Sequence, residues 1–191
     1  MQEIERNTIE MAAGGDIAAF EEIYKQCSST VYTLAFGITR NRQDAEEATQ
    51  DVFIKVFRGL KNFRFGSSFG TWIYRIAVNT AINLYHKRAR RGAASLQYDE
   101  IKDAQPEAPD MRQKEIRRED AAASVAAILE NVSPEHRSCI MLREIEGLNY
   151  KEMAGTLKIP LNTVRSRLKR AREALIAYCR KEGIRYELRK N

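Results

Sequence analysis

The stretch from Ile54 to Gly92 reads IKVFRGLKNFRFGSSFGTWIYRIAVNTAINLYHKRARRG. It carries nine Lys or Arg side chains and neither Asp nor Glu. Seven aromatic residues stand among these cations: Phe57, Phe63, Phe65, Phe69, Trp72, Tyr74 and Tyr85. Lys and Arg replace the counterions of a phosphate backbone. Aromatic rings stack on unpaired bases, and each stacked base contributes about 1–3 kcal/mol to binding. The stretch therefore predicts a nucleic-acid surface.

The second half of this stretch has the periodicity of an amphipathic helix from Thr71 to Arg90. At 100° per residue, one side collects a core-facing stripe: Ile73, Ile76, Ala77, Thr80 and Leu84. Another face collects a row that we call the ladder: Trp72, Arg75, Asn79, Asn83, His86 and Arg90. The ladder can follow a phosphate backbone and hydrogen-bond base edges. The alternative is a solvated helix face beside an aromatic core, but the absence of acids favours the nucleic-acid interpretation.

The charge of the chain changes sign along its length. The net charge of +6 divides into −6 for residues 1–53, +9 for 54–92, −3 for 93–122, −2 for 123–157 and +8 for 158–191. Two basic blocks in acidic surroundings are typical of two nucleic-acid contacts joined by a spacer. The 191 residues, 43% of them hydrophobic, suffice for one large domain or two small ones.

Composition favours a cytoplasmic protein without a metal or cofactor. The sequence has no apolar run of about 18 residues, and the three glutamates among its first ten residues are unlike a secretory signal. Three cysteines form no CxxC pair and are interpreted as buried or incidental thiols: Cys27, Cys139 and Cys179. His136 and Cys139 could form half of a zinc site, but no second pair completes it.

Two helices are expected before residue 61. Asp16 can cap a helix from Ile17 to Ile38, which is either continuous or broken near Ser28-Ser29. After Asn41, a second helix runs from about Gln43 to Leu60. Its expected apolar side consists of Ala45, Ala48, Val52, Phe53, Val56, Phe57 and Leu60.

Two segments lack helical periodicity. Residues 62–70 form a loop whose three phenylalanines either plug the helix junction or form a pocket. Residues 93–122 contain two prolines and alternate acid with base, which marks a linker. The linker divides the chain into domains of residues 1–92 and 123–191.

The C-terminal part contains clear helix caps. Ser133 can cap a helix that starts at Pro134 and stops at Gly147. Asn149, with a glutamate three positions on, has the capping-box pattern for a short helix over 150–157.

A further helix follows that short one, and its two sides differ. The inward side is Leu161, Val164, Leu168, Ala171 and Leu175, and the polar side is Asn162, Arg165, Ser166, Arg167, Lys169, Arg170 and Arg172. A short helix, a tight turn and a helix with outward cations predict a helix-turn-helix that reads the DNA major groove. A surface hairpin of two helices with a basic face is the alternative.

Three motifs together are similar to those of a known family. They are DAEEATQDVF at 44–53, FGTWIYRIAVN at 69–79, and YKEMA at 150–154 with TVRSRLKRAR at 163–172. The chain resembles the extracytoplasmic-function sigma factors of bacteria, in the sigma-70 family, over about 18–91 and 123–177. The resemblance implies an all-α protein of two domains, sigma regions 2 and 4, that joins core RNA polymerase and directs promoter-specific initiation.

The resemblance also implies roles for matching residues. The clamp helices of the large polymerase subunit would bind Asp44, Glu47, Gln50 and Asp51. The melted minus-ten element would contact Phe63, Ser67, Ser68, Phe69, Asn79 and Asn83, together with the ladder residues Trp72 and Arg75. Groove-reading positions for the minus-thirty-five element would be Arg165, Ser166 and Arg170, beside the outward Asn162 and Lys169. An anti-sigma factor, holding the protein until a stress or envelope signal arrives, is a further implied partner.

Two other classes of function are open from the residues alone. A transcriptional regulator of another class could use the same helix-turn-helix, but it leaves the acid-free stretch unexplained. An enzyme is disfavoured because the chain has two histidines, no Gly-rich phosphate loop and no evident pairing of a nucleophile with a base. We therefore expect no catalytic residues.

Overall fold

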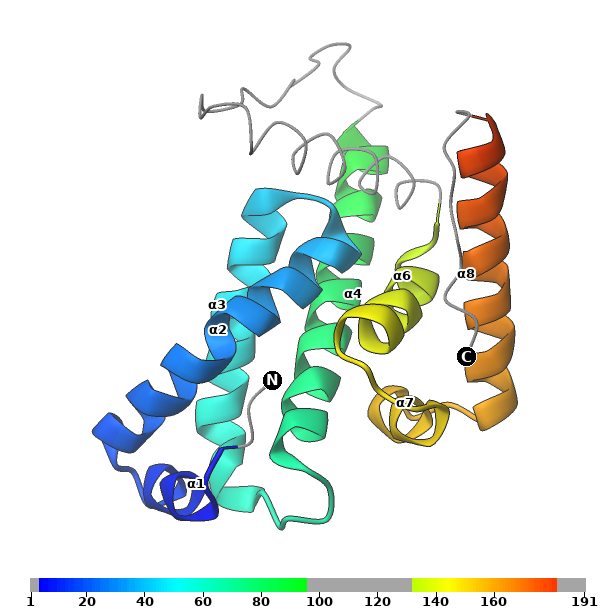
Figure 1. Cartoon of the computed structure of the whole chain (residues 1–191). Helices are drawn as coiled ribbons and strands as arrows, with labels where there is room; N and C mark the ends of the chain where they lie inside the picture. Colours follow the sequence, from blue (N-terminus) through cyan, green and yellow to red (C-terminus); the bar gives the residue numbers. More distant parts are fainter. Residues whose placement is uncertain (1–3, 96–131, 182–191) are drawn as a thin grey trace, which may run out of the picture.

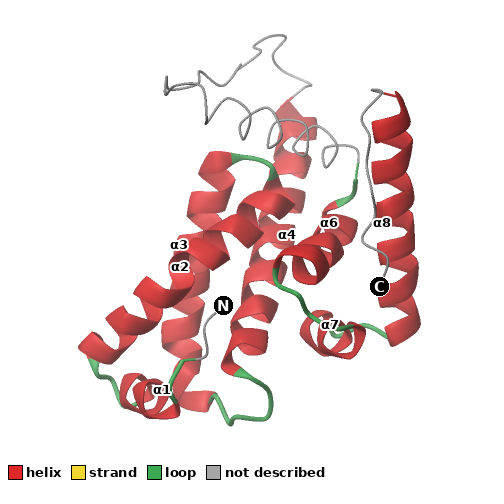
Figure 2. Ribbon diagram, in the orientation of Figure 1, coloured by secondary structure: helices red, strands yellow, loops and turns green. Residues whose placement is uncertain are grey.

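The computed structural model describes residues 4–95 and 132–181, and within these ranges the chain is helical with connecting turns and loops (Figures 1 and 2). The N-terminal unit contains α1 (Arg6–Ala13), α2 (Ile17–Thr39), α3 (Arg42–Gly59), the short 3-10 helix η1 (Leu60–Asn62) and α4 (Phe69–Ser95). The C-terminal unit contains α6 (Pro134–Ile140), the π-helix η2 (Met141–Ile145), α7 (Tyr150–Leu157) and α8 (Leu161–Lys181). The predicted all-α class is confirmed.

The Asp16 side chain sets the start of α2 as predicted, and Asn41, which was not predicted as a cap, sets the start of α3. The Asp16 carboxylate accepts a hydrogen bond from the Ala19 N–H at 2.9 Å, and α2 continues unbroken past Ser28-Ser29. The Asn41 side chain accepts from the Asp44 N–H at 2.9 Å at the start of α3. Each bond satisfies one N–H that lacks a partner in the first helical turn. The helix α1 was not predicted from the sequence.

The helix that carries the ladder is longer than predicted. It begins at Phe69, two residues earlier, where the Ser68 hydroxyl accepts from the Thr71 N–H at 3.1 Å. It ends at Ser95, three residues into the expected linker. Residues 96–122 of that linker lie outside the described residues.

The caps of the C-terminal unit are also as predicted. Ser133 accepts from the His136 N–H with Pro134 in the first turn, and Asn149 and Glu152 form a complete capping box. One detail differs, since the helix that starts at Pro134 widens into the π-helix η2 before Gly147. In α8, Val164, Leu168, Ala171 and Leu175 are buried as expected, and Leu161 is half-buried.

The two units share one hydrophobic core. In Figure 1, α4 lies between α2 and α3 on one side and α6 and α7 on the other. Val31, Leu34 and Ile73 of the N-terminal unit belong to the same buried cluster as Leu142 and Met153 of the C-terminal unit. This arrangement places the C-terminal unit against the helix that carries the ladder.

Candidate nucleic-acid interface and protein-binding face

Four aromatic rings from the loop between α3 and α4 and from the first turn of α4 cluster around Phe63. The Phe63 ring lies 4.9 Å from Phe65, 5.4 Å from Phe69 and 5.1 Å from Trp72, measured between centroids. Phe69 is buried, Phe63 is half-buried and Phe65 is 37% exposed. Gly59 makes room for this cluster, because a Cβ at that position would lie 3.2 Å from the Trp72 ring. The phenylalanines therefore plug the helix junction, which was one of the two predicted possibilities.

The same loop also borders a cavity of about 890 Å³. Its lining includes Ser67 and Ser68 of the loop, Tyr74 of α4 and Glu146 of the C-terminal unit. Ser67 is half-buried and Ser68 is exposed. The second predicted possibility, a pocket, is thus present beside the plug rather than inside it.

The ladder residues differ in exposure along α4. Trp72 and Arg75 are half-buried, whereas Asn79, Asn83, His86 and Arg90 are exposed. On the opposite side, Ile73 and Ala77 are fully buried, and the buried Thr80 hydroxyl accepts from the Lys55 ammonium at 2.8 Å. The predicted division of α4 into a core stripe and a polar row is confirmed.

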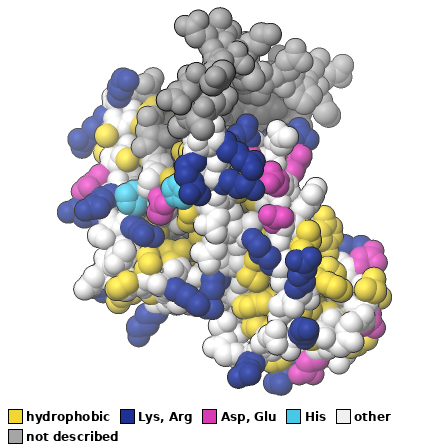
Figure 3. Space-filling model, turned by 180° about the vertical axis from the view of Figure 1, so that it is seen from behind, with side chains coloured by type: hydrophobic (Ala, Val, Ile, Leu, Met, Phe, Trp, Pro, Cys, Tyr) yellow, Lys and Arg dark blue, Asp and Glu magenta, His cyan; other side chains and the backbone are white. Residues whose placement is uncertain are grey.

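The C-terminal half of α4 is rich in cations. Asn83, His86, Lys87 and Arg90 line a shallow depression of about 810 Å³. In Figure 3, which shows the molecule from behind, Lys and Arg side chains gather around the histidines. A surface of this kind attracts phosphate groups.

One side of α3 presents acids and apolar groups to the surface, and we call it the α3 face. Its exposed residues lie three positions apart, except that Gln50 and Asp51 are adjacent: Glu47, Gln50, Asp51, Ile54 and Phe57. Ile54 and Phe57 are each 47% exposed. The prediction of an inward Phe57 was wrong, because its ring lies at the edge of the α2–α3 packing and meets Phe20 edge to face at 5.0 Å.

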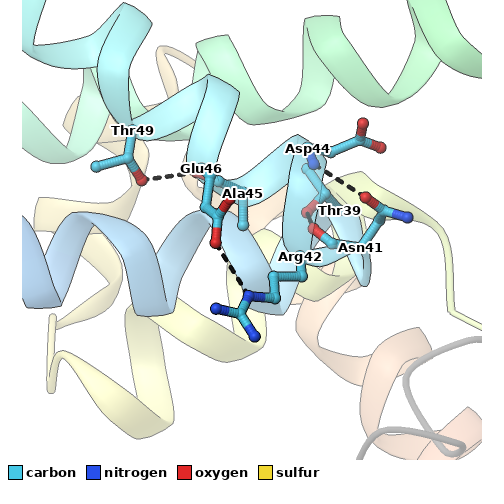
Figure 4. A network of polar contacts seen from close by, with 7 residues as sticks. All are labelled: Thr39, Asn41, Arg42, Asp44, Ala45, Glu46 and Thr49. Carbon is cyan, nitrogen blue, oxygen red and sulfur yellow. Dashed lines mark hydrogen bonds and ion pairs between the residues drawn. The ribbon is translucent and has the colours of Figure 1, made fainter. Parts of the chain in front are cut away.

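Asp44 is separate from the other predicted polymerase-binding residues. Its side chain is 7% exposed and forms an ion pair with Arg88 of α4. Figure 4 shows the start of α3, where Asn41 binds the Asp44 backbone and Arg42 pairs with Glu46 at 3.0 Å. The Asp44 carboxylate is therefore part of the packing between helices.

The predicted groove-reading residues share one exposed side of α8. Asn162, Arg165, Ser166, Lys169 and Arg170 are all exposed. The turn before α8 passes through Lys158 with φ of 52°, the left-handed conformation that ends α7. The predicted helix-turn-helix geometry is present, with α8 as its second helix.

A histidine lies next to this basic surface. The pKa of His136 is lowered by partial burial and by the positive charges of Arg167 and Arg170. The neutral imidazole is therefore favoured there. Among the residues that the structure describes, no three His, Cys, Asp or Glu side chains gather as metal ligands.

The sequence did not predict that the C-terminal unit contacts the ladder helix at two places. Near its N-terminal end, the Tyr74 hydroxyl donates to the Glu146 carboxylate, and the Arg75 guanidinium donates to the Gly155 carbonyl at 3.3 Å. Near its C-terminal end, His86 lies 2.8 Å from the Glu135 carboxylate. Burial raises the pKa of Tyr74, and its hydrogen bond to Glu146 adds to the effect.

Two further findings concern the helices and the cysteines within residues 4–95 and 132–181. No helix there is both long and apolar enough to cross a membrane. Cys27 and Cys139 are fully buried free thiols, as the sequence suggested, and burial raises the pKa of each to about 11.

Comparison with known proteins supplies the family context. The chain matches the family Sigma-70 region 2 over residues 23–91 and Sigma-70, region 4 over residues 122–175. It is 36% identical to the ECF RNA polymerase sigma factor SigE of Mycolicibacterium smegmatis, over 90% of this chain and 66% of that protein, just under two thirds. It is 35% identical to the RNA polymerase sigma-H factor of Pseudomonas aeruginosa, over 91% and 93% of the two chains.

A solved structure shares the fold. It is the sigma factor RpoE of Bartonella quintana in complex with the anti-sigma factor NepR, with a TM-score of 0.66 and 21% identity. The similarity covers 86% of this chain and 98% of that one.

Proposed function

We propose a binding role for each exposed surface of this chain. The premise is that the chain belongs to the extracytoplasmic-function sigma factors of the sigma-70 family and directs transcription initiation. It is not an enzyme, so its surfaces act by binding. One observation carries the assignment of those surfaces, namely that exposed polar groups gather on three separate helices, α3, α4 and α8. We assign residues 1–92 to the region 2 domain, 93–122 to a linker and 123–191 to the region 4 domain.

The α3 face is the proposed site for the clamp helices of the large polymerase subunit. It combines exposed apolar groups, Ile54 and Phe57, with the acids Glu47 and Asp51. An apolar centre with a charged margin is the usual composition of a protein–protein interface. The acids add electrostatic steering towards a basic partner. Asp44 takes part indirectly, since its ion pair with Arg88 fixes the first turn of α3 against α4.

The ladder and the loop before it are the proposed site for the melted minus-ten element. Asn79 and Asn83 offer exposed amides that can hydrogen-bond base edges, while Arg75 and the basic end of α4 attract phosphates. The rings of Phe63 and Trp72 are half-buried at the edge of this site, and their exposed parts could stack on unpaired bases. Flipping a base out of a duplex costs a few kcal/mol, which such contacts can offset. Strand separation by this route needs no ATP.

The outward side of α8 is the proposed reader of the minus-thirty-five element. Arg165, Ser166 and Arg170 project from the second helix of the helix-turn-helix, beside Asn162 and Lys169. An Arg side chain can bind guanine through two hydrogen bonds in the major groove. Because the two DNA contacts and the polymerase contact belong to one chain, each contact raises the effective concentration for the others, and the overall affinity exceeds that of any single contact.

Run-off transcription on a library of genomic fragments tests this proposal. Purified core polymerase with the chain is expected to yield discrete transcripts from a limited set of promoters. Core polymerase without the chain supplies the background, and the same core with another sigma factor shows that the enzyme is active. A folded chain that gives no transcript with active core would contradict the proposed function.

An anti-sigma factor is the proposed regulatory partner, and the cytoplasm the proposed compartment. The structural neighbour from Bartonella quintana supports the regulatory partner, because it is a sigma factor bound to an anti-sigma factor. The test is a competition experiment. The chain is used to capture binding proteins from the cells in which it occurs, and the captured protein should then displace the chain from core polymerase. A captured protein that leaves holoenzyme formation unchanged would contradict the regulatory role.

A further inference from the structure

We propose that Arg6 of α1 is a positioning residue for the minus-ten loop, the segment of residues 63–68 between η1 and α4. Its guanidinium stacks on the Phe65 ring, holds that residue in an unfavourable backbone conformation, and so sets the direction in which the loop meets the melted strand. The proposal rests on the function assigned above to this loop. It adds α1, which received no role there, to the elements that determine base preference.

Phe65 has a backbone conformation that its bulky side chain disfavours. Its φ is 54°, in the left-handed region that glycine adopts freely and other residues rarely adopt. Such a residue persists where contacts of its side chain offset the cost. The Phe65 ring lies 4.9 Å from the Phe63 ring, measured between centroids, and the guanidinium carbon of Arg6 lies 4.5 Å from its centroid. Because the ring is 37% exposed, deep burial does not hold it, and these contacts are needed.

The Arg6 side chain is itself held in place by α1. Its Nε donates to the Glu10 carboxylate at 2.7 Å, one helical turn along, which orients the plane of the guanidinium. The helix is anchored in turn, because Ile9 and Ala12 are buried in the hydrophobic core. It also packs against η1, directly before the minus-ten loop (Figure 1). A cation is attracted to the face of an aromatic ring, so the stack joins the loop to an anchored element.

Two anchored residues thereby enclose the tip of the minus-ten loop. Phe65 is the first, and Ser68 is the second, because its hydroxyl accepts from the Thr71 N–H at 3.1 Å at the start of α4. Gly66 and Ser67 lie between them in the sequence. Gly66 is exposed, and a Cβ there would meet none of the described residues within 4 Å apart from its chain neighbours. Packing does not restrain Gly66, so the orientation of Ser67 depends on the two anchors, and the first anchor depends on α1.

Base preference in the minus-ten element tests the proposal in holoenzyme. Each position of that element, in a promoter found by run-off transcription, is changed to the other three bases. Transcription is then compared between the wild-type and Arg6→Ala chains with core polymerase. At one or two positions, Arg6→Ala should lower the ratio between the preferred base and the next by about two- to five-fold, which corresponds to the loss of one exposed cation–π contact. Ratios in the minus-thirty-five element should not change, and unchanged minus-ten ratios would overturn the proposal.

A double-mutant cycle shows whether the effect passes through Phe65. Phe65→Gly removes the ring and relieves the left-handed backbone, so Arg6→Ala should change the minus-ten ratios no further in that background. An equal effect of Arg6→Ala with and without the Phe65 ring would overturn the proposal.

The matched control is Arg42→Ala, at the opposite end of α3 from the minus-ten loop. It removes a similarly exposed guanidinium that pairs with Glu46 at 3.0 Å, also one helical turn along. The minus-ten ratios should stay at their wild-type values in this variant. A loss as large as that of Arg6→Ala would reduce the effect to surface charge and overturn the proposal.

Fluorescence of the single tryptophan reports on the loop in the chain alone. Trp72 lies 5.1 Å from the Phe63 ring, which the Phe65 ring contacts in turn. We expect acrylamide to quench Trp72 more strongly in Arg6→Ala than in the wild-type or Arg42→Ala chains. The urea midpoint should stay unchanged, because Arg6 is exposed. Equal quenching in all three chains would also overturn the proposal.

The outcomes distinguish this inference from the proposed function on which it rests. Normal transcription with unchanged minus-ten ratios in Arg6→Ala removes only the role of Arg6. A folded wild-type chain that gives no transcript with active core removes the proposed function, and the role of Arg6 in base preference with it.

Discussion

The Arg88 guanidinium donates a hydrogen bond of 2.5 Å to the Asp44 carboxylate and so joins the first turn of α3 to the basic end of α4. Asp44 is almost fully buried, whereas half of the Arg88 side chain is exposed. The pair connects the helix proposed to bind polymerase with the helix proposed to bind melted DNA.

Replacing Asp44 with Ala should lower stability without removing a polymerase contact. We expect the free energy of unfolding to fall by about 0.5–1.5 kcal/mol, because the ion pair between the two helices is lost while water can hydrate the half-exposed Arg88. Urea denaturation measures the loss of stability. Polymerase affinity is measured under conditions in which the variant and the wild-type chain are both folded. Glu47→Ala is the matched control, with the opposite expectation: unchanged stability and weaker polymerase binding. A larger loss of affinity in Asp44→Ala than in Glu47→Ala would contradict this division of roles.

Phe57→Ala should weaken polymerase binding more than it weakens the fold. The ring is 47% exposed, and the described structure gives it one aromatic neighbour, Phe20. We expect a cost of about 1 kcal/mol to folding from that ring contact and a larger cost, about 2 kcal/mol, to binding if the ring is a central anchor. Titration of labelled core polymerase gives the affinity. Ile17→Ala, which removes a 67% exposed side chain from the start of α2, should leave the affinity unchanged.

Much of the helical framework follows from the sequence because helix starts are local. Asp16 and Asn149 each bond a backbone N–H within three residues, so a short window of sequence contains the whole interaction. The core stripe of α4 follows for the same reason, since side chains one turn apart share a face. These predictions required no knowledge of tertiary packing.

The features that the sequence did not reveal depend on distant partners. Asp44 is buried by Arg88, 44 residues away, and Arg75 contacts Gly155, 80 residues away. Helical periodicity identifies an outward side chain, but it cannot tell solvent from another part of the chain. The position of Phe57 at the edge of the α2–α3 packing is likewise fixed by how the two helices meet.

Asn79→Ala should slow promoter opening while polymerase binding stays intact. Asn79 is exposed in the middle of the ladder, where its amide can bond an unpaired base. Loss of one such bond, worth about 0.5–1.5 kcal/mol, corresponds to a rate of opening that is lower by about two- to thirteen-fold. Permanganate footprinting of unpaired thymines follows the bubble over time. Thr33→Ala, at an exposed position of α2, is the control, and equal rates in both variants would remove Asn79 from the proposed site.

Arg170→Ala should weaken recognition of the upstream element by about 1–3 kcal/mol. The side chain is exposed on α8 and projects from the side opposite the buried Leu168 and Ala171. Transcription from promoters with single changes in the upstream element gives the specificity. Arg180→Ala removes the same charge near the end of α8 and should reduce binding to all sequences alike, if at all. If the Arg170 variant keeps the wild-type order of preference among upstream changes, the residue does not read bases.

His136 should make the fold less stable as the pH falls. Its pKa in the folded chain is lowered, first by burial and then by Arg167 and Arg170, although the nearby Glu135 opposes the shift. Below the ordinary histidine pKa of about 6.5, the unfolded chain therefore binds a proton that the folded chain binds less readily. That difference stabilises the unfolded state, so the contribution of this residue to stability declines from pH 7 towards pH 5.

The variant His136→Gln isolates this effect, because glutamine does not titrate. Urea midpoints of the variant and the wild-type chain are compared at pH 5, 6 and 7. We expect the wild-type chain to lose more stability than the variant as the pH falls, since other groups titrate equally in both. Promoter phosphates near Arg167 and Arg170 would offset the two positive charges and make protonation of His136 easier. Bound DNA should therefore reduce the difference in pH dependence between the wild-type chain and the variant. Parallel pH profiles for the two chains without DNA would show that the imidazole does not sense these arginines.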